Sequence, residues 1–319
     1  GNFLPSVVPH SADADVIVPD NGSTDQSLAV LKEEFPQVSV IALPENYGFC
    51  GGYNRALKQV DADYFVLLNS DVEVTAGWLA PLQDVLDRDA TAGAVQPKIL
   101  SWAEKEKFEC AGATGGYIDA LGYPFCRGRV FSQVETDVGQ YDDETEIFWA
   151  TGACMMVRAE AFNQLGGLDD GLFAHMEEID LCWKMQRANL KICYTGNSKV
   201  YHLGAGTLGY DNPRKTYLNF RNGLILIFRH FYNNELVWKL PLRILLDWVA
   251  ALTFLLKGKF TTSGSVFRAH WHFLRDWQVQ RRKRRDLHKQ YPYYPRRNIK
   301  PGLILVDYYL RRKRTFTAQ

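Results

Sequence analysis

The sequence predicts an α/β protein in which a mostly parallel sheet is flanked by helices and is followed by a basic helical region. Three observations lead to this prediction. Short apolar runs alternate with helix-like segments over the first hundred residues, which is typical of a parallel sheet covered on both faces. Two of the apolar runs end at carboxylates, Asp20 and Asp71. Acidic and basic residues are divided unequally between the first two thirds and the last third of the chain.

The first hundred residues contain the alternating elements. We expect strands at residues 13–20, 38–43, 63–71 and 92–100, and helices at residues 23–35, 51–60 and 76–87. Ser23 and Thr24 are both suited to cap the first helix, and its residues Leu28, Leu31 and Phe35 share one face. This order predicts parallel pairing, because each helix returns the chain to the starting edge of the sheet.

The stretch VLLNSDVEV, residues 66–74, places polar side chains directly after a buried strand. A simple turn would explain Asn69 and Asp71 as ordinary strand-end residues. Ligands of such sheets, however, bind outside the carboxyl ends of the strands, and Asp20 also stands at such an end. We therefore favour a site at this edge of the sheet, where a carboxylate meets a metal ion and a phosphate.

The middle of the chain carries a second group of acids. We expect loops and short strands over residues 101–147, a strand and a helix over 148–167, an amphipathic helix over 173–190, and two short strands over 191–204. Glu177, Glu178 and Asp180 lie in the first turns of the amphipathic helix, where acids suit the helix dipole. His202 follows at the end of the last strand. Carboxylates with one imidazole suit a divalent cation that keeps water and phosphate ligands.

The charge distribution divides the chain in two. Residues 1–213 contain 14 Lys and Arg against 31 Asp and Glu, whereas residues 214–319 contain 23 against 5. The second part also holds apolar helical segments, at 218–232 and 240–260. The latter is a poor candidate for a membrane span because Arg243 and Asp247 interrupt it.

Basic clusters in the last third are interleaved with aromatic residues. The clusters are RRKRR at 281–285 and RRKR at 311–314, and the aromatic residues are Trp271, Trp277, Tyr291, Tyr293 and Tyr294. This composition is typical of a region that docks on an anionic membrane surface. The alternative is a helical subdomain that packs on the rest of the chain and leaves its basic face in water. Nucleic acid is disfavoured as a partner because no recognition motif accompanies the charge.

The cysteines indicate a reducing compartment. All six are scattered and none forms a CxxC pair, which disfavours a zinc ribbon or a disulfide framework. The opening residues GNFLPSVVPH lack the basic start and the apolar run of a signal peptide. We therefore expect a cytoplasmic protein, held at the inner face of the cell membrane through its basic C-terminal third.

Six stretches, in order, resemble the motifs of family 2 inverting glycosyltransferases. They are VIVPDNGSTD, ENYGFCGGYNRAL, VLLNSDVEV, ATGACMMVRAEAF, LGGLDDGLFAHMEEIDLCWKMQRANL and KVYHLGAGTL. The resemblance covers residues 13–225 and is greatest to the bacterial rhamnosyltransferase-like branch, which builds surface polysaccharides. It implies a GT-A fold, a nucleotide-diphosphate sugar donor and a Mg²⁺ or Mn²⁺ ion.

The resemblance implies roles for the residues at the strand ends. Asp20 matches the carboxylate that contacts the donor base. Matches to the nucleotide loop and the helix start that follows it are Asn46, Gly48, Gly51, Gly52 and Asn54. Asn69 and Asp71 match the two ends of the DxD motif, with Asp71 as the metal ligand and Asn69 in place of the usual first Asp. His202 matches a histidine that completes the metal shell.

The resemblance also implies the chemistry at the acidic helix. The family's base is the second acid of an ED pair, and the pair here is Glu177-Glu178. Glu178 therefore takes the place of the base, with Glu177 in reserve, and Asp180 is a structural or positioning acid that we group with the acceptor side. A further group, which the resemblance places along the acceptor, comprises Trp149, Thr151 and Gly152. Helix-terminal charge alone is the alternative explanation for the three acids.

One departure concerns the start of the sheet. The family normally opens with a further strand and a turn that holds the nucleoside, and no match to either precedes residue 13. We therefore expect unpaired strand edges and an incomplete nucleotide pocket in a transferase domain of residues 1–213, followed by the helical region of residues 214–319.

These observations predict an enzyme that moves a sugar to a hydroxyl of a saccharide or polyprenyl-linked acceptor. A nucleotidyltransferase is the alternative enzyme, although no Gly-, Arg- and Lys-rich phosphate loop is visible near the start of the chain. A sugar- or lipid-binding scaffold without turnover is the alternative that is not an enzyme, and it is favoured by the departures at Asn69 and Glu178.

Overall fold

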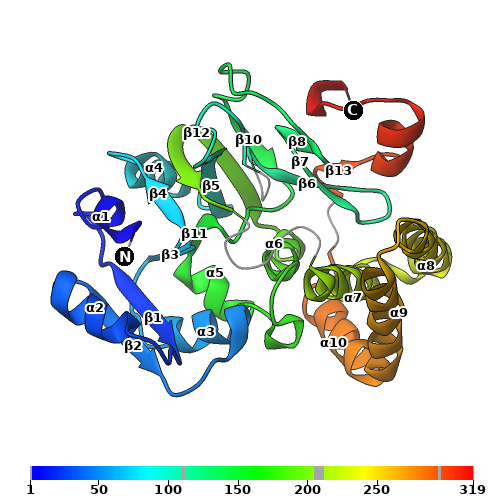
Figure 1. The fold of residues 1–319 in the computed structure, drawn as a ribbon, viewed down its shortest axis with the longest axis horizontal. Helices are drawn as coiled ribbons and strands as arrows, with labels where there is room; N and C mark the ends of the chain where they lie inside the picture. The colour runs from blue at the N-terminus through cyan, green and yellow to red at the C-terminus, as the bar shows by residue number, and fades with distance from the viewer. Residues whose placement is uncertain (1, 110–112, 205–211, 294–295, 319) are drawn as a thin grey trace.

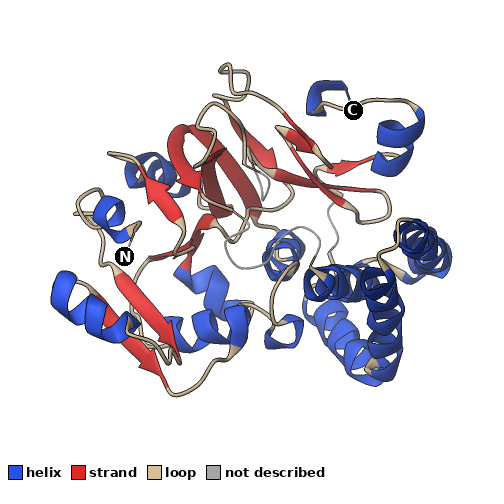
Figure 2. Cartoon of the chain, viewed as in Figure 1, coloured by secondary structure: helices blue, strands red, loops and turns tan. Residues whose placement is uncertain are grey.

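The computed structural model describes residues 2–109, 113–204, 212–293 and 296–318. It confirms the α/β class, with three sheets in one part of the molecule and a group of helices beside them (Figures 1 and 2). Cys110, Tyr294 and the end of the KVYHLGAGTL stretch lie outside the described residues.

The first sheet is a parallel pair next to three helices. Its strands are β1 (Ile17–Asn21) and β2 (Ser39–Leu43), and the nearby helices are α1 (Leu4–Val7), α2 (Ser27–Glu34) and α3 (Gly48–Leu57). In the described residues β1 pairs with β2 alone, and β3 of the next sheet pairs with one neighbour alone. In these residues β1 and β3 are therefore edge strands of their sheets.

The central sheet has six strands in the order β10-β12-β5-β11-β3, with β4 also paired to β12. The strands are β3 (Tyr64–Leu68), β4 (Val72–Val74), β5 (Ala92–Ser101), β10 (Glu144–Ile147), β11 (Cys154–Arg158) and β12 (Lys191–His202). Only β5 and β12 pair in parallel. The expectation of a mostly parallel sheet is corrected here to a mixed sheet, because β11 lies antiparallel between β3 and β5.

One strand, β12 (Lys191–His202), forms where two were expected over residues 191–204. β12 stays paired with β5 through a register shift between Thr195 and Lys199. In the sequence the intervening Gly196 and Asn197 resemble a turn. In the structure they form an irregularity within one long strand. The strand consequently delivers His202 beside β4, where it pairs with Val72.

A third sheet covers one end of the central sheet, and three helical segments complete this part. The sheet has the order β13-β6-β7-β8-β9, with β6 (Gly116–Asp119), β7 (Pro124–Cys126), β8 (Arg129–Val130), β9 (Gln133–Val134) and β13 (Ile299–Lys300). The helical segments are α4 (Leu79–Arg88), α5 (Ala159–Gln164) and α6 (Glu177–Arg187), with a short 3₁₀ turn, η1 (Asp170–Leu172), before α6. Because β13 comes from the far end of the chain, the last third of the chain is built into this sheet.

The last third is helical, as predicted. It contains α7 (Pro213–His230), α8 (Asn233–Leu256), α9 (Phe260–Arg275) and α10 (Trp277–Gln290), followed by the short helical turns η2 (Val306–Leu310) and η3 (Phe316–Ala318). Asn212 caps α7 by accepting a hydrogen bond from the Arg214 amide at 2.8 Å, and Pro213 occupies the first turn. The expected single helix at 240–260 is wrong at both ends. α8 begins before Pro241, and Gly258, at φ +73°, turns the chain into α9.

The main apolar core joins the two parts. It contains β-strand residues such as Phe65 and Leu67, α6 residues such as Trp183, and α7 residues such as Ile227 and Phe228. α6 thus lies between the central sheet and the C-terminal helices (Figure 1). None of the helices, over the residues described, combines the length and the apolar character needed to cross a bilayer.

Candidate active site

Asp71 and His202 meet at the edge of the central sheet. The imidazole Nε2 lies 3.1 Å from Asp71 Oδ1, and Nδ1 lies 3.4 Å from Glu109 Oε2. His202 and Glu109 are buried, whereas a quarter of the Asp71 side chain is exposed. Asp71 is therefore the member of this group that faces solvent.

The two carboxylates decide the protonation of the histidine. Burial alone lowers the pKa of His202, but hydrogen bonds with Asp71 and Glu109 outweigh it and raise the pKa to about 9. The hydrogen bond from His202 in turn lowers the pKa of Asp71, in spite of the opposing effect of burial. A negative carboxylate is consequently maintained at the exposed end of the group.

This arrangement fits a divalent cation held by a small number of protein ligands. Asp71 offers an oxygen, and His202 Nε2 beside it would offer a nitrogen once a bound cation displaces the proton held there. Glu109, at the other ring nitrogen, is placed as the carboxylate that orients a metal-binding imidazole. Within the described ranges no cluster of three or more Cys, His, Asp or Glu could hold a metal. The remaining ligands would have to come from water and a bound diphosphate.

The predicted nucleotide loop is tied to the end of β1 by Asn21. Its Nδ2 donates to the Gly48 carbonyl at 2.9 Å, and its Oδ1 accepts from the Tyr47 amide at 3.0 Å. Asn46 accepts from the Gly48 amide at 2.9 Å. Asp20 is buried, and its Oδ2 accepts from the Ser23 amide at 3.1 Å, which closes the turn after the strand. The loop and the strand end are therefore held as one unit.

Gly48 also brings this loop against the segment that precedes α6. Its φ is +72°, and a Cβ on it would lie 2.6 Å from the ring of Phe173. The Cys50 amide donates to the Phe173 carbonyl at 3.3 Å. A glycine is needed at position 48 both for this backbone conformation and for the close approach of Phe173.

Asn54 and Asn69 make mainly structural contacts in the described residues. Asn54 exchanges hydrogen bonds with the backbone of Leu168, at 2.7 and 3.0 Å, and donates to Asp170 at 2.6 Å. The Asn69 amide donates to the Ala153 carbonyl at 2.9 Å. Asn54 thus joins α3 to the segment before α6, and Asn69 joins the end of β3 to the turn before β11.

Glu177 and Glu178 begin α6 without neutralising partners. Burial, and next the charge of Glu178, raises the pKa of Glu177 well above its usual value. Burial likewise raises the pKa of Glu178, to about 7, although backbone amides oppose the shift. In the part of the chain that the structure describes, each has a buried Oε2 with no hydrogen-bond partner. A carboxyl with a pKa near neutrality is suited to accept a proton at physiological pH.

The turn before these acids is strained. Phe173, His175 and Met176 all have positive φ, at 68°, 65° and 72°. Such values are uncommon outside glycine and cost free energy, so surrounding contacts must hold them. Burial lowers the pKa of His175 to about 4, and the charge of Lys215 adds to this effect, which keeps its imidazole neutral.

Asn222 of α7 holds the strained turn. The side chain is fully buried, and its amide nitrogen lies 3.1, 3.0 and 2.7 Å from the carbonyls of Leu172, Ala174 and His175. Arg221, next to it, donates to the carbonyls of Gly171 and Leu172 at 3.0 and 2.9 Å. The C-terminal helices thus position the start of α6.

Asp180 and Asp169 lie near Glu177 and Glu178 and, in contrast to those two residues, are ion-paired in the described part of the chain. Asp180 is fully buried, lies 2.9 Å from His230 Nε2 and 2.7 Å from Lys184 Nζ, and has a pKa held well below its usual value. Although burial opposes this shift, the charge of Lys184 and the hydrogen bond from His230 outweigh it. Asp169 is paired with Arg229 at 2.5 Å and with Lys283 at 2.7 Å. Asp180, grouped above with the acceptor side, is enclosed by protein, so we assign it to anchoring α6 on α7.

The segment before β11 links the two groups of acids. A Cβ on Gly152 would lie 3.9 Å from the Glu178 Cβ, and the following Ala153 accepts from Asn69. Thr151 is buried, and its backbone amide donates to Gln96 Oε1 at 3.0 Å. Trp149 is buried too, and its ring nitrogen donates to the Tyr117 carbonyl at 3.0 Å. Gly152 is therefore a predicted acceptor-side residue that the structure places beside Glu178.

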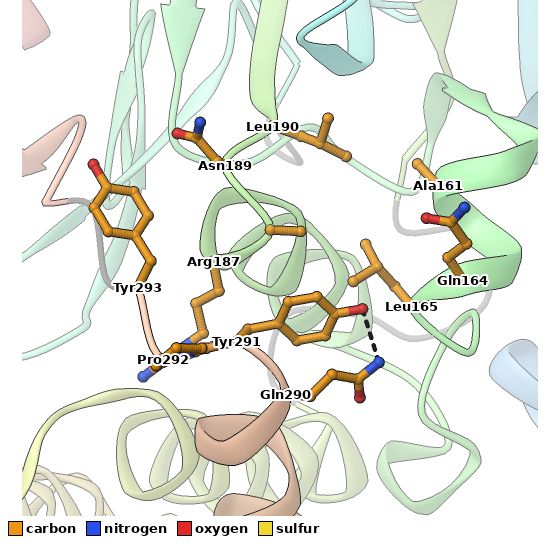
Figure 3. Close-up of a pocket in the computed structure, with 11 residues that line it drawn as sticks. Ala161, Gln164, Leu165, Arg187, Asn189, Leu190, Gln290, Tyr291, Pro292 and Tyr293 are labelled. Carbon is orange, nitrogen blue, oxygen red and sulfur yellow. Dashed lines mark hydrogen bonds between the residues drawn. The ribbon is translucent and has the colours of Figure 1, made fainter.

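A cavity lies away from these residues. It has a volume of about 520 Å³ and is lined by residues of α5, the end of α6 and the segment after α10, among them Gln164, Asn189 and Tyr291 (Figure 3). Neither Asp71 nor Glu178 lines it. The candidate site thus rests on the arrangement of its side chains and does not rest on an enclosed cavity.

Replacing Asn222 by Ala is expected to lower kcat about tenfold or more, with a smaller effect on donor binding. The change removes the hydrogen bonds that hold the strained turn, and displacing a catalytic group by about 1 Å costs of the order of 10²-fold in rate. Buried carbonyls left unsatisfied also lower the free energy of unfolding by about 1–3 kcal/mol. Kinetics and thermal melting at one pH measure both effects, with Asn234→Ala on the surface of α8 as the control. An unchanged kcat in a folded Asn222→Ala protein would contradict this role.

Residues that sequence reasoning missed fall in two groups. Glu109 lies in an irregular, glycine-rich stretch, where no periodicity points to it. Asn21, Arg221 and Asn222 act through contacts distant in the sequence. Of these residues, only Asn222 could have been identified from the sequence, because a polar residue within the apolar run of α7 must find a buried partner.

Comparisons with known proteins agree with this geometry. Residues 6–166 match glycosyl transferase family 2. An N-acetylglucosaminyl-diphospho-decaprenol L-rhamnosyltransferase of Mycobacterium tuberculosis is 28% identical over 244 residues, covering 72% of this chain and 78% of the relative. A low-salt glycan biosynthesis hexosyltransferase of Haloferax volcanii is 22% identical over 216 residues, covering 66% of each. The crystal structure of GalNAc-T7 with UDP, GalNAc and Mn²⁺ has a TM-score of 0.55 at 16% identity, covering 72% of this chain and 45% of that one.

An α/β fold with acids gathered at one sheet edge and at the start of a buried helix defines a nucleotide-sugar transferase of the GT-A type. The chain belongs to glycosyl transferase family 2, and it is a glycosyltransferase that takes its sugar from a nucleotide-sugar donor. The family, the fold class and the enzyme class expected from the motifs are thereby confirmed.

Proposed function

We propose that this glycosyltransferase inverts the configuration of the transferred sugar and passes it to a hydroxyl of a saccharide or polyprenyl-linked acceptor in surface polysaccharide synthesis. The name of the M. tuberculosis relative, with its diphospho-decaprenol acceptor, supports a lipid-linked acceptor. The observation that carries the proposal is the pair Glu177 and Glu178: in the described residues each has a buried Oε2 with no hydrogen-bond partner, while Asp169 and Asp180 are neutralised by cations.

Glu178 serves as the base in this proposal, with Glu177 in reserve. Its carboxylate accepts the proton of the acceptor hydroxyl as the hydroxyl oxygen forms a bond to the anomeric carbon. The bond from that carbon to the diphosphate oxygen breaks on the opposite face, and the nucleotide diphosphate leaves with the electron pair. Burial of the Glu178 carboxyl, which raises its pKa, favours proton uptake at this position.

Asp71 and His202 hold a Mg²⁺ or Mn²⁺ ion in this proposal, and Glu109 orients the imidazole from its other side. Such an ion, when bound, supplies Lewis-acid stabilisation to the departing diphosphate. Asp20, Asn46, Gly48, Asn54 and Asn69 form the nucleotide side. Asn21 positions the loop that carries two of them.

The division of the chain at residue 213 assigns transfer to residues 1–213 and membrane contact to residues 214–319. We propose that the enzyme works at the inner, cytoplasmic face of the cell membrane, on an anionic surface. The excess of basic residues in the second part supports this placement, as do the contacts by which Asn222 joins the two parts.

A thermal-shift screen tests the donor side. UDP, dTDP, GDP and CDP are added singly, each with and without Mn²⁺. We expect one nucleotide to raise the melting temperature in a metal-dependent manner, because a ligand that binds only the folded state stabilises it by about 2.7 kcal/mol at a hundred times its Kd. No shift with any of the four would contradict the proposed nucleotide site.

The alternatives predict different products. The family match disfavours a nucleotidyltransferase, which would release pyrophosphate where a glycosyltransferase releases nucleotide diphosphate. A binding scaffold would show the thermal shift without turnover. Assay of the released nucleotide diphosphate in the presence of an acceptor therefore separates the three.

A further inference from the structure

α8 has its charged side inside and its apolar side outside. The residues Glu235, Lys239, Arg243 and Asp247 recur every fourth position and are all buried. They are satisfied there in ion pairs, Lys239 with Glu235 at 2.9 Å and Arg243 with Asp247 at 3.0 Å. A helix on the surface of a globular protein has the opposite arrangement, with its apolar stripe facing the core.

The outward side of α8 is apolar over its length. Trp238, Leu245, Trp248, Leu252 and Leu256 are between 50% and 80% exposed. Their spacing of three, four and seven residues places them on one side of the helix, opposite the buried charges. Five large apolar side chains in water are not explained by packing within this chain.

α9 extends the exposed apolar side beside α8. Phe260, Phe267 and Trp271 are between 52% and 70% exposed, and its inward side carries both polar residues and the apolar Val266, Ala269 and Phe273. Ser263 donates to the Ala251 carbonyl at 2.9 Å, and His270 Nε2 lies 3.2 Å from Asp247. The two helices pack together at one side of the molecule (Figure 1). We name the exposed apolar residues of both helices the outer α8–α9 face.

The charge of residues 214–319 indicates which kind of partner the outer α8–α9 face would bind. Each acid of residues 214–319 is ion-paired, and the acids are Glu235, Asp247, Asp276, Asp286 and Asp307. Against these 5 acids stand 23 Lys and Arg. Lys257 in the turn between the helices, and Arg268 and Arg275 on α9, are exposed around the apolar residues. The surroundings of the face are therefore cationic.

We propose that the outer α8–α9 face inserts into the interfacial layer of an anionic phospholipid bilayer. This inference rests on the proposed function for its biological setting, and it names the element that makes the membrane contact. Aromatic and aliphatic side chains flanked by cations are suited to the boundary between headgroups and acyl chains. Since neither helix, as described, is long and apolar enough to span a bilayer, the helices lie along the surface.

A second copy of the chain fits this face less well. A two-fold contact would bring the same cationic surroundings of both copies together, and like charges repel. An anionic bilayer instead neutralises them and buries the apolar side chains at the same time. The contacts of α7 with the turn before Glu177 would then hold the acceptor side of the site at a set distance from the lipid.

The test is co-sedimentation of the full chain with vesicles that contain neither donor nor acceptor. We expect binding to phosphatidylcholine vesicles that include phosphatidylglycerol, weaker binding to phosphatidylcholine alone, and a decrease with salt. The triple variant Leu252→Ser, Leu256→Ser and Trp271→Ser should lower the partition at least about tenfold, because each side chain loses its apolar transfer free energy. Its melting temperature should match that of the wild type, since all three residues are exposed.

The matched control is Leu28→Ser, Val40→Ser and Val138→Ser, three exposed apolar residues of the transferase part, which should bind vesicles as the wild type does. The proposal is overturned by a wild type that stays in the supernatant at low salt, or by a triple variant that sediments undiminished. It is also overturned if light scattering shows a dimer that the triple variant converts to monomer. Because no turnover is read, vesicle binding without transferase activity would refute the proposed function alone.

Discussion

Glu178→Gln is expected to lower kcat by about 10²–10⁴-fold while donor binding is retained, because the amide cannot accept the proton of the acceptor hydroxyl. The substitution keeps the size of the side chain at the start of α6. In the described residues the carboxyl it replaces has a buried Oε2 with no hydrogen-bond partner, and burial raises its pKa to about 7. Initial-rate kinetics together with a nucleotide thermal shift measure both quantities.

The pH profile supplies a second readout of the same prediction. Below about pH 7 the base is protonated, so wild-type kcat/KM should rise with pH and level off above that value. The residual rate of Glu178→Gln should lack this rise. The free energy of unfolding depends on pH in the opposite direction to kcat/KM. The folded state binds this proton more tightly than the unfolded chain, so the carboxyl reduces the free energy of unfolding as pH rises from about 4.5 through 7. Glu178→Gln should consequently melt no lower than the wild type at pH 8.

Glu177→Gln is the matched control, one residue away on the same helix. It should affect kcat less than Glu178→Gln does, since Glu177 is the more deeply buried of the two. If Glu177→Gln abolished transfer and Glu178→Gln did not, the base would be Glu177. Full activity in both variants would remove the pair from the reaction.

Asp71→Ala should abolish the metal-dependent part of the nucleotide thermal shift and lower kcat/KM by at least about 10²-fold, corresponding to several kcal/mol of lost charge stabilisation. The substitution removes the exposed oxygen of the group and leaves His202 with Glu109 alone. The thermal-shift screen with and without Mn²⁺ measures the first effect independently of turnover.

Glu73→Ala controls for loss of charge in the same strand region. The Glu73 carboxylate accepts hydrogen bonds from Lys105 at 2.7 Å and from the ring nitrogen of Trp102 at 2.8 Å. The variant should keep the nucleotide shift of the wild type. A shift that survives Asp71→Ala, or one that disappears equally in Glu73→Ala, would mean that Asp71 does not hold the metal and diphosphate.

Much of the fold was predictable because its signals are local. Apolar runs and helix periodicity depend on neighbouring residues, so most strands and helices fall close to their expected places. The cap expected at Ser23 or Thr24 is wrong, because α2 begins later, after Gln26. The errors occur where distant contacts override local signals. Gly196 and Asn197 stay within β12 because β5 holds the strand on both sides of them, and Pro241 stays within α8. The antiparallel direction of β11 between β3 and β5 could likewise not be predicted from the alternation of apolar runs and helix-like segments.

The candidate site was likewise predictable where its signals are local and unpredictable where it depends on contacts distant in the sequence. Asp71, Glu178 and His202 stand at element ends that the sequence marks, and the order of six motifs identified the family. Sequence order alone did not show that Glu109 lies against His202, or that Asn222 holds the turn before Glu177. These pairs are separated by tens of residues, and their contact depends on how the sheets and helices pack.

The sequence by itself determined the class of enzyme, the strand-end acids and the excess of positive charge in the last third. Only the tertiary structure decided which acids are neutralised and which are left unpaired, because neutralisation depends on cations brought from other elements, such as Arg229 and Lys283 beside Asp169. It also decided that α8 turns its charges inward, since composition gives the amount of apolar surface, whereas packing on α7 and α9 selects the side that meets solvent.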